Sequence, residues 1–502
     1  MSRLLMRNLV PLALFLLALP LAAQRIDSVA HTLPVEAMPP ATLDELARQV
    51  VAQPLNGRHD ERPRHTRRIA AKSTMAPVVA DFVTAPAAVA VPVVARGFRS
   101  SFDPLPAATA YFYPPDAAGA VGPHHVVGAY NNSLSVQDRD GKQLAFLSIF
   151  QFWKSETSLQ LGNFIFDPRV MYDAVNDRWV LVMLTDFNEV QGALLLAVSA
   201  TGDPAGVWRR YRVNVSTNPN IDLDFTRMAM TADQIVITAY EYENVDVLNG
   251  ADIFTIAKSG AYSDTQTPAV VKTQSSFFPD LTPVSSSDTT VRLLNEENEN
   301  LLQFELTGGH LVQTGSYAPP ASFFINSDAC DQLGTSKQLD CGDSLLHYAI
   351  VRDGVLWVVQ KASADRSIIV VWKIAGTSVK GFVIGDPAAD YAYPSLAVNR
   401  LGAALVGYST MSPSMYASAA CRYIDPAGNV SVPATVKSGE DWNGNYRWGD
   451  YSTTLVDPLD DTSFWTLQTY AAPAVGGAHI SWATWWSYVQ VKAPRVRAVR
   501  HP

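Results

Sequence analysis

Seven aspartates recur through the second part of the chain at an average spacing of about 56 residues: Asp116, Asp167, Asp224, Asp280, Asp343, Asp390 and Asp450. Converging carboxylates can bind a cation such as Ca²⁺, which prefers several hard oxygen ligands, or can orient the hydroxyl groups of a sugar. The simpler interpretation is that each aspartate caps its own turn or bonds the backbone of the neighbouring unit. If this set carries catalysis, the candidate residues are Asp450, Asp167 and Asp224, with Tyr451 as a candidate phenol.

The segment Asp441–Tyr451 reads DWNGNYRWGDY and combines aromatic rings with amide, guanidinium and carboxylate groups. Flat aromatic faces stack on the C–H surfaces of sugars, while the polar groups bond hydroxyls. The segment therefore predicts a ligand-binding surface. Trp442, Arg447 and Asn445 are its candidate ligand residues, whereas Trp448 and Tyr451 fit a packing role equally well.

One segment has the alternating oxygen ligands of a metal-binding loop. Asn218, Asn220, Asp222 and Asp224 alternate along NPNIDLD, so Asp222 and Asp224 are candidate Ca²⁺ ligands. The segment lacks the glycine and the final glutamate of an EF-hand loop. A polar loop between two units is the simpler interpretation, and no other cofactor is indicated.

The chain has three cysteines. Cys330 and Cys341 lie close together in a stretch rich in Gly, Asp and Ser, and in an exported protein they are expected to form a disulfide. Cys421 lies in an apolar run and is expected to be a buried free thiol. Neither cysteines nor histidines cluster with the spacing of a zinc site.

These residues have to be positioned by strands, because short apolar runs separated by turn signals fill the chain from residue 101 onward. Units such as DPRVMYDAVNDRWVLVML, from Asp167, repeat the order strand, tight polar turn, apolar strand. The spacing of the units predicts an all-β fold, a seven-bladed β-propeller with one four-stranded sheet per unit. A six- or eight-bladed ring and a pair of β-sandwiches are the alternatives. Because the aspartates precede the inner strands, they are expected to form a ring at one mouth of the channel.

The last unit lacks an obvious fourth strand after residues 480–491. A strand near Val91–Phe98 can supply it, close the ring and remove an open sheet edge. The rest of residues 24–100 is expected to be a poorly structured segment with one short helix within Thr42–Gln53, where Thr42 and Glu45 have the spacing of a capping box. Residues 101–492 then form the propeller and 493–502 a tail.

The first 23 residues have the pattern of a cleavable signal peptide: Arg3 and Arg7, then an apolar run from Leu9 to Leu21. We therefore expect a secreted or periplasmic protein without an integral membrane segment. The alternative is an uncleaved N-terminal anchor. The whole chain has a net charge of −9, and its first 100 residues are net positive, so the body of the chain is strongly acidic, which disfavours nucleic acid as a partner. The sequence does not indicate the oligomeric state.

Four segments carry a resemblance to a known group: Pro114–Val127, Asp167–Trp179, Ser199–Tyr211 and Arg447–Trp465. They resemble secreted bacterial β-propellers of sialidase-like architecture, most of them uncharacterised. The stretch from Ser199 to Trp208 is also similar to the Asp-box of that architecture, with altered spacing. In the family the Asp-box is a structural turn on the outer side of a blade, so the resemblance implies a fold and not an activity.

A sialidase would need three arginines around the substrate carboxylate and a tyrosine paired with a carboxylate. Arg169, Arg227 and Arg447 are candidate ligand residues for that role, and Tyr451, Tyr391 and Tyr393 are candidate phenols. The arginines stand at different offsets from their aspartates, and the family's early Arg-Ile-Pro motif is missing. The resemblance therefore gives little support to sialidase activity itself.

Three functions fit these residues. The first is an exported propeller that binds a glycan or an envelope component at the channel mouth without catalysis. The second is a carbohydrate-active enzyme, a glycoside hydrolase or polysaccharide lyase, that uses the same mouth. The third is a scaffold for protein interaction. The geometry of the mouth should separate them, because hydrolysis needs an accessible pair of carboxylates.

Overall fold

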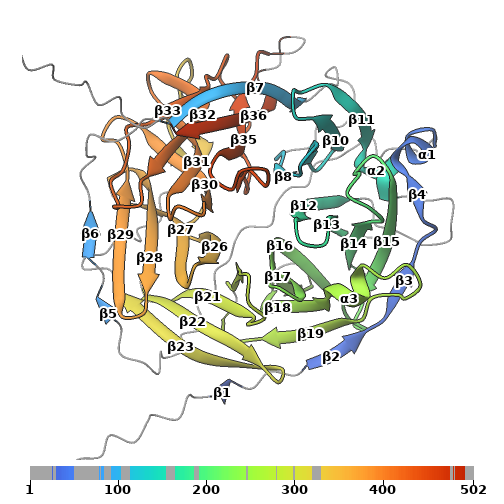
Figure 1. The fold of residues 1–502 in the computed structure, drawn as a ribbon. Helices are drawn as coiled ribbons and strands as arrows, with labels where there is room; N and C mark the ends of the chain where they lie inside the picture. The colour runs from blue at the N-terminus through green and yellow to red at the C-terminus, as the bar shows by residue number, and fades with distance from the viewer. Residues whose placement is uncertain are drawn as a thin grey trace, which may run out of the picture.

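The computed structural model describes residues 25–26, 30–49, 78–79, 81–83, 92–102, 114–153, 164–185, 192–244, 247–278, 280–297, 300–318, 329–363, 365–474, 477, 479 and 481–491. Its strands are arranged as seven blades around a central axis, as Figure 1 shows. The predicted seven-bladed β-propeller is thus confirmed. The expected signal peptide, residues 1–23, and the tail, residues 493–502, lie outside the described residues.

Each blade is an antiparallel sheet whose first strand lies nearest the axis. Blade 1 contains β8 (Ala118–Val121), β9 (His125–Ala129), β10 (Ser133–Asp138) and β11 (Gln143–Ser148). Blade 2 contains β12 (Ile165–Asp173), β13 (Arg178–Thr185), β14 (Ala193–Ser199) and β15 (Val207–Asn214). Blade 3 contains β16 (Ile221–Met230), β17 (Gln234–Glu243), β18 (Val247–Ala257) and β19 (Val270–Ser275).

The second half of the ring repeats this order. Blade 4 contains β20 (Thr282–Ser285), β21 (Arg292–Glu297), β22 (Asn300–Thr307) and β23 (His310–Ala318). Blade 5 contains β26 (Leu346–Arg352), β27 (Val355–Ser363), β28 (Ser367–Ala375) and β29 (Ser378–Ile384). Blade 6 contains β30 (Asp390–Val398), β31 (Ala404–Ser412), β32 (Met415–Ile424) and β33 (Ala434–Lys437). Blade 7 contains β34 (Thr453–Val456), β35 (Phe464–Ala471), β36 (Trp482–Val491) and β7 (Pro92–Phe102).

The core lies between the blades. Apolar side chains of neighbouring blades interlock in a separate cluster at each of the seven interfaces. Middle strands such as β14 and β31 are buried along their whole length, because both of their faces pack against another blade. This explains why β14 reads ALLLAVS, an almost continuous apolar run, and why even the Ser and Thr side chains of β31 are buried.

Blade 7 is closed by a strand from the N-terminal part of the chain. β7 pairs antiparallel with β36 along its length, which confirms the strand predicted near Val91–Phe98. Tyr130 of blade 1 also connects β7 to β36. Its hydroxyl donates to Ser100 Oγ of β7 (2.8 Å) and accepts from Thr484 Oγ1 of β36 (3.0 Å). The ring is therefore held by both a sheet ladder and a buried hydrogen-bond relay.

Other N-terminal strands line the outer edges of blades 2 to 5, where Figure 1 shows them outside the ring. They are β1 (Arg25–Ile26), β2 (Ala30–Leu33), β3 (Val35–Ala37), β4 (Ala41–Thr42), β5 (Val78–Val79) and β6 (Asp81–Val83). The predicted short helix is α1 (Leu43–Ala47), and its capping box between Thr42 and Glu45 is present. Pairing these outer edges removes exposed ladders that would otherwise invite association.

The remaining elements are short: helices α2 (Ile149–Trp153) and α3 (Lys258–Ala261), and the hairpin of β24 (Ala329–Cys330) and β25 (Leu339–Asp340). Within the described residues, no helix has the length and apolar character needed to cross a membrane. The Asp-box-like segment forms the turn between β14 and β15, where Asp203 Oδ1 accepts from the Ala205 amide (2.9 Å). It has the structural position that the resemblance implied.

We expect the pairing of β7 with β36 to contribute more stability than the edge strands. A chain that begins at residue 92 should keep the closed ring and lose at most a few degrees of Tm. A chain that begins at residue 103 loses β7, exposes the β36 ladder and should melt at least several degrees lower still. Thermal unfolding followed by circular dichroism measures both. Equal Tm values for the two chains would contradict this prediction.

Candidate functional site

The inner strands share a distortion near their starting ends. β12, β16 and β30 each carry a β-bulge, and in each bulge the first residue has a positive φ: Asp167 (54°), Phe225 (55°) and Tyr393 (51°). Asp116, just before β8, has the same conformation (46°). Left-handed backbone is unfavourable for such residues, and strain of this kind concentrates at functional or tightly constrained sites. We call the end of the channel at which the inner strands begin the axial mouth.

This distortion corrects the predicted ring of seven equivalent aspartates. The residues that occupy the place of Asp167 in blades 3 and 6 are Phe225 and Tyr393, not Asp224 and Asp390. Asp390 instead accepts from Arg366 Nη1 (2.9 Å) and from the Ser367 amide (3.0 Å) of blade 5. It therefore bonds the neighbouring blade, as the simpler interpretation had it. Asp224 lies one residue before Phe225 and Asp390 three residues before Tyr393, so the regular recurrence of aspartates in the sequence does not follow the register of the bulges.

Three aspartates do converge at the axial mouth. Asp116 Oδ1 accepts from the Asp450 amide (3.0 Å), and Asp116 Oδ2 accepts from Asn131 Nδ2 (2.6 Å). Asn131 Oδ1 in turn accepts from the Asp167 amide (2.9 Å). Asp116, Asp167 and Asp450 are only 2–4% exposed. The carboxylates of blades 7, 1 and 2 thus form one buried, hydrogen-bonded cluster.

Crowding of these carboxylates changes their titration. Burial, followed by the nearby carboxylates of Asp224 and Asp450, raises the pKa of Asp167 to about 7. Its hydrogen bond from Tyr451 (2.8 Å) and the charge of Arg169 offset only part of this. Burial and the carboxylates of Asp450 and Asp167 also raise the pKa of Asp116 well above its usual range. The cluster therefore holds protons at neutral pH, a property of carboxyl groups that act as general acids.

Tyr451 stands at the centre of the three predicted arginines. The Arg169 guanidinium lies 3.3 Å from the centroid of the Tyr451 ring, and the Tyr451 phenol also interacts electrostatically with Arg227 and Arg447. Burial raises the pKa of Tyr451 well above its usual range, followed by the effect of the Asp167 carboxylate. The phenol is therefore a neutral hydrogen-bond donor to Asp167 and not an activated nucleophile.

Each of the three arginines is engaged by the protein. Arg169 donates to the Thr226 carbonyl (2.8 Å) and to the Tyr348 hydroxyl (3.2 Å). Arg227 pairs with Asp280 (2.5 Å) and lies over the ring of Phe225 (4.4 Å to the centroid). Neither side chain is more than 6% exposed. These two arginines contribute to the packing of the mouth, and a carboxylate ligand would have to displace their present partners.

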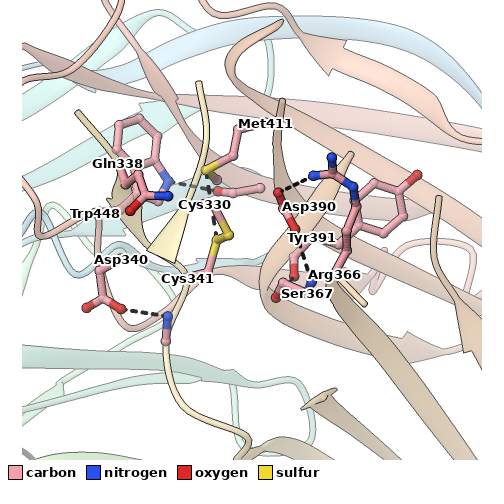
Figure 2. Close-up of a disulfide and its surroundings, with 12 residues drawn as sticks. Cys330, Gln338, Asp340, Cys341, Arg366, Ser367, Asp390, Tyr391, Met411 and Trp448 are labelled. Atoms are coloured by element: carbon pink, nitrogen blue, oxygen red, sulfur yellow. Dashed lines mark hydrogen bonds and ion pairs between the residues drawn. A yellow bond between two sulfur atoms is a disulfide. The ribbon is translucent and has the colours of Figure 1, made fainter. Parts of the chain in front are cut away.

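Arg447 joins the cluster to the disulfide hairpin. Its Nη1 donates to Asp340 Oδ2 (2.7 Å) and its Nη2 to Asp450 Oδ2 (3.1 Å). Next to Asp340, Cys341 is bonded to Cys330, with 6.0 Å between their Cα atoms; Figure 2 shows this hairpin between Trp448 and the Asp390–Arg366 pair. Cys421, the third cysteine, is buried and free. The disulfide thus stabilises a loop that supplies a carboxylate to the mouth.

Two loops contact one another over this part of the mouth: residues 329–345 and residues 438–452. Gln332 Nε2 donates to the Asn443 carbonyl (2.7 Å), and Gln332 Oε1 accepts from the Asn443 amide (2.9 Å). The Asp340 amide donates to the Tyr446 carbonyl (2.7 Å). The candidate ligand residue Asn445 lies within the second loop, where its Oδ1 accepts from the Arg447 amide (3.3 Å).

Trp442 lies outside the buried cluster, on a partly exposed surface of these two loops. Its indole stacks on His479 (centroids 4.2 Å apart, planes at 12°), and Lys337 Nζ lies 5.8 Å from its centroid. His479 Nδ1 is 2.9 Å from Asp441 Oδ2. A side chain added at Gly334 would meet both Trp442 (3.3 Å) and Tyr416 (3.2 Å). Trp442, His479, Asp441, Lys337 and Tyr416 form what we call the rim surface.

The two predicted metal ligands, Asp222 and Asp224, each accept a hydrogen bond from the backbone amide that follows them. Asp222 Oδ1 accepts from the Leu223 amide (2.9 Å), and Asp224 Oδ1 accepts from the Phe225 amide (2.8 Å). Across all described residues, no group of three or more His, Cys, Asp or Glu side chains is arranged to hold a metal ion. Asp222 and Asp224 therefore cap backbone, and Ca²⁺ binding here stays a prediction.

The structure thus brings Asp450, Asp167, Tyr451, Arg447, Arg169 and Arg227 to one place, and Asp224 acts electrostatically on Asp167. Sequence reasoning missed Asn131, Asp340 and Tyr348, which bond these residues from other loops. Asn131 and Tyr348 belong to no motif. Asp340 directly precedes Cys341, whose disulfide was expected. This position in the sequence is the one feature that could have indicated its role.

Comparisons with known proteins give limited guidance. No family model matches the chain, and no curated protein matches it. Among solved structures, it is similar to a protein of unknown function from Dyadobacter fermentans (TM-score 0.38, 10% identity, 65% of this chain and 94% of the other). It is also similar to an α-L-arabinofuranosidase of Fusarium graminearum (0.37, 9%, 79% and 98%) and to a Hadza microbial sialidase (0.37, 10%, 72% and 73%). At this degree of likeness, none of them assigns an activity to this chain.

The raised pKa of Asp167 predicts how stability depends on pH. Between the usual value of 3.8 and about 7 the folded state retains a proton that the unfolded state releases, so the free energy of unfolding falls as pH rises through this window. Asp167→Asn should remove the part of this dependence that Asp167 contributes, a difference from the wild type of ~1–4 kcal/mol across the window. Chemical denaturation at several pH values measures it.

Asp288 provides the control. Arg292 holds its pKa below the usual value, so Asp288→Asn should leave the dependence on pH above 4 as in the wild type. An unchanged pH profile in Asp167→Asn would contradict the assigned protonation.

Proposed function

We propose that the protein is an exported β-propeller module that binds a glycan, free or as part of the cell envelope, at the rim surface. The observation that carries this proposal is the difference in exposure between the centre of the axial mouth and the rim surface. The carboxylates and arginines at its centre are buried and bonded to one another, whereas the aromatic and polar groups of the rim surface remain partly exposed. A ligand can reach the rim surface without displacing the partners that the central residues already have.

The chemistry of the rim surface suits neutral sugars. The indole of Trp442 and the ring of Tyr416 offer aromatic area, while Lys337 donates hydrogen bonds and the Asp441–His479 pair can both donate and accept. The neighbouring side chain of Tyr446 is 48% exposed and extends the aromatic area.

The exported location rests on the expected signal peptide and agrees with the disulfide of Cys330 and Cys341, since such bonds persist in oxidising compartments. The acidic body of the chain is equally consistent with a partner other than nucleic acid. We therefore propose a periplasmic or secreted protein whose ligand is an extracellular or envelope polysaccharide.

Replacement of Trp442 tests the binding proposal. In affinity electrophoresis against a panel of bacterial and plant polysaccharides, the wild type should be retarded by at least one of them, and Trp442→Ala should lose about tenfold or more of that affinity. Phe146→Ala is the matched control, because Phe146 is an exposed aromatic residue (45%) on the outer strand of blade 1. Equal losses in both variants, or no retardation of the wild type, would contradict binding at the rim surface.

A second function, a carbohydrate-active hydrolase, is favoured by one observation. Asp167 combines a pKa of about 7 with a hydrogen bond from Tyr451 and a neighbouring carboxylate, which are the features of a general acid near neutral pH. For this function the mouth would have to open, because Asp167 is 4% exposed. Asp450 or Asp224 would then supply the second carboxylate.

Release of reducing ends separates the two functions. The binding proposal predicts no release above the level without protein, in the wild type and in Asp167→Asn alike. Release by the wild type that falls at least 100-fold in Asp167→Asn would establish the hydrolase instead, because loss of a general acid typically costs about 10²–10⁴-fold. Asp288→Asn, in an exposed turn, serves as the control.

A further inference from the structure

A buried triad of ionisable side chains lies in blade 3, on three strands of one sheet. Lys272 Nζ is 2.6 Å from Asp252 Oδ2 and 2.6 Å from Glu241 Oε2. The three residues come from neighbouring strands, Glu241 from β17, Asp252 from β18 and Lys272 from β19. In the register of the sheet, Asp252 lies opposite Ala239 and Lys272 opposite Phe254, so the three side chains share one face.

The triad is buried among apolar side chains. Asp252 is fully buried, and Glu241 and Lys272 are 4% exposed. Phe254 and Ala239, on the same face, belong to the apolar cluster between blades 2 and 3, and Lys272 Nζ also donates to the Val215 carbonyl of blade 2 (3.3 Å). Burial in such a site disfavours the ammonium form of Lys272, but the carboxylates of Asp252 and Glu241 outweigh it and raise the pKa of Lys272. A base in direct contact with Nζ is therefore needed to release the amine, and Glu241 has that position.

The two carboxyl groups have different environments. Glu241 Oε1 accepts from Gln274 Nε2 (2.6 Å) and from Asn249 Nδ2 (3.3 Å), so Glu241 is held in place as an acceptor. Asp252 interacts with Lys272 and Glu241. Burial raises its pKa well above the usual range, which favours the neutral carboxylic acid. A neutral carboxylic acid beside an amine and a second carboxylate is the set of groups that amide formation requires.

Another buried lysine in the same blade lacks this set. Lys258 Nζ is 2.8 Å from Asp173 Oδ2, but Asp173 also accepts hydrogen bonds from Tyr262 (2.8 Å) and Asn176 (3.0 Å). These bonds, with the charge of Lys258, hold the pKa of Asp173 below its usual value in spite of burial. This pair is an ordinary ion pair and provides an internal comparison.

We propose that Lys272 and Asp252 condense spontaneously in the folded protein to an intramolecular isopeptide bond, with Glu241 as the proton carrier. Glu241 takes a proton from the Lys272 ammonium, and the free amine attacks Cγ of Asp252. The new bond joins Nζ to Cγ, and the bond from Cγ to the hydroxyl oxygen breaks. Glu241 returns its proton to the leaving hydroxyl, which departs as water, and then takes the second proton that the attacking nitrogen gives up, so Glu241 ends protonated. No oxidant, cofactor or second substrate is consumed.

The bond would join β18 to β19, the two outer strands of the four that form blade 3. β2 pairs with β19 on its other side, so the link would also stabilise the attachment of the N-terminal strands to the ring. It would persist after denaturation, unlike every hydrogen bond of the blade.

Tryptic digestion of the wild-type protein tests the proposal directly. Without the bond, cleavage after Arg227, Lys258, Lys272 and Arg292 yields peptides 228–258, 259–272 and 273–292. With the bond, trypsin cannot cleave after Lys272, and mass spectrometry should find peptide 228–258 joined to 259–292, lighter than their sum by one water molecule. Cleavage after Lys258 in the same digest shows that the comparison lysine is free.

Three variants assign the roles. Asp252→Ala and Glu241→Gln should both restore peptide 259–272, whereas Asp173→Ala should retain the linked species. Recovery of peptide 259–272 in full yield from folded wild-type protein would overturn the proposal, whether or not any variant folds. Linkage at the wild-type level in Glu241→Gln would overturn the role of Glu241.

Discussion

The pairing of β7 with β36 is the interaction on which the rest of this structure depends. A propeller blade buries its apolar faces only against its two neighbours, so an unclosed ring would leave the faces of blades 7 and 1 open to water. The ladder between β7 and β36, with the Tyr130 relay to Ser100 and Thr484, closes that gap. At the axis, the bond from the Asp450 amide to Asp116 joins the same two blades.

Closure also explains the chemistry of the axial mouth. Because blades 7, 1 and 2 meet there, Asp450, Asp116 and Asp167 come together without a metal-ligand arrangement among the described residues. Their mutual repulsion is relieved by protonation and by Asn131, Tyr451 and the arginines. The polar groups at the centre of the mouth therefore bond one another. The surface that is accessible to a ligand lies further from the axis, on the loops that the disulfide hairpin stabilises.

Much of the fold could be predicted from the sequence, because repeated apolar runs and turn signals report local structure directly. The closing strand was predictable, since the last unit lacked a partner. The site was predictable only in part. Tyr451, Asp167 and Arg447 could be named. The bulge position is taken by Phe225 in blade 3 and by Tyr393 in blade 6, and the spacing of the aspartates does not reveal this, because any residue type can occupy a bulge. The stacking of Trp442 on His479 depends on two loops meeting in space, which no local pattern encodes.

The position of β7 has a consequence for how the molecule reaches its native state. β7 ends at Phe102 and its partner begins at Trp482, so blade 7 cannot form until almost the whole chain is available. Contacts between such distant segments form slowly, because the chain loses the entropy of closing a long loop before the contacts can stabilise it. Until then Trp482 and Trp486, both buried in the finished ring, remain exposed to other chains. These two indoles are therefore the side chains most in need of protection from other chains between synthesis and the closure of the ring.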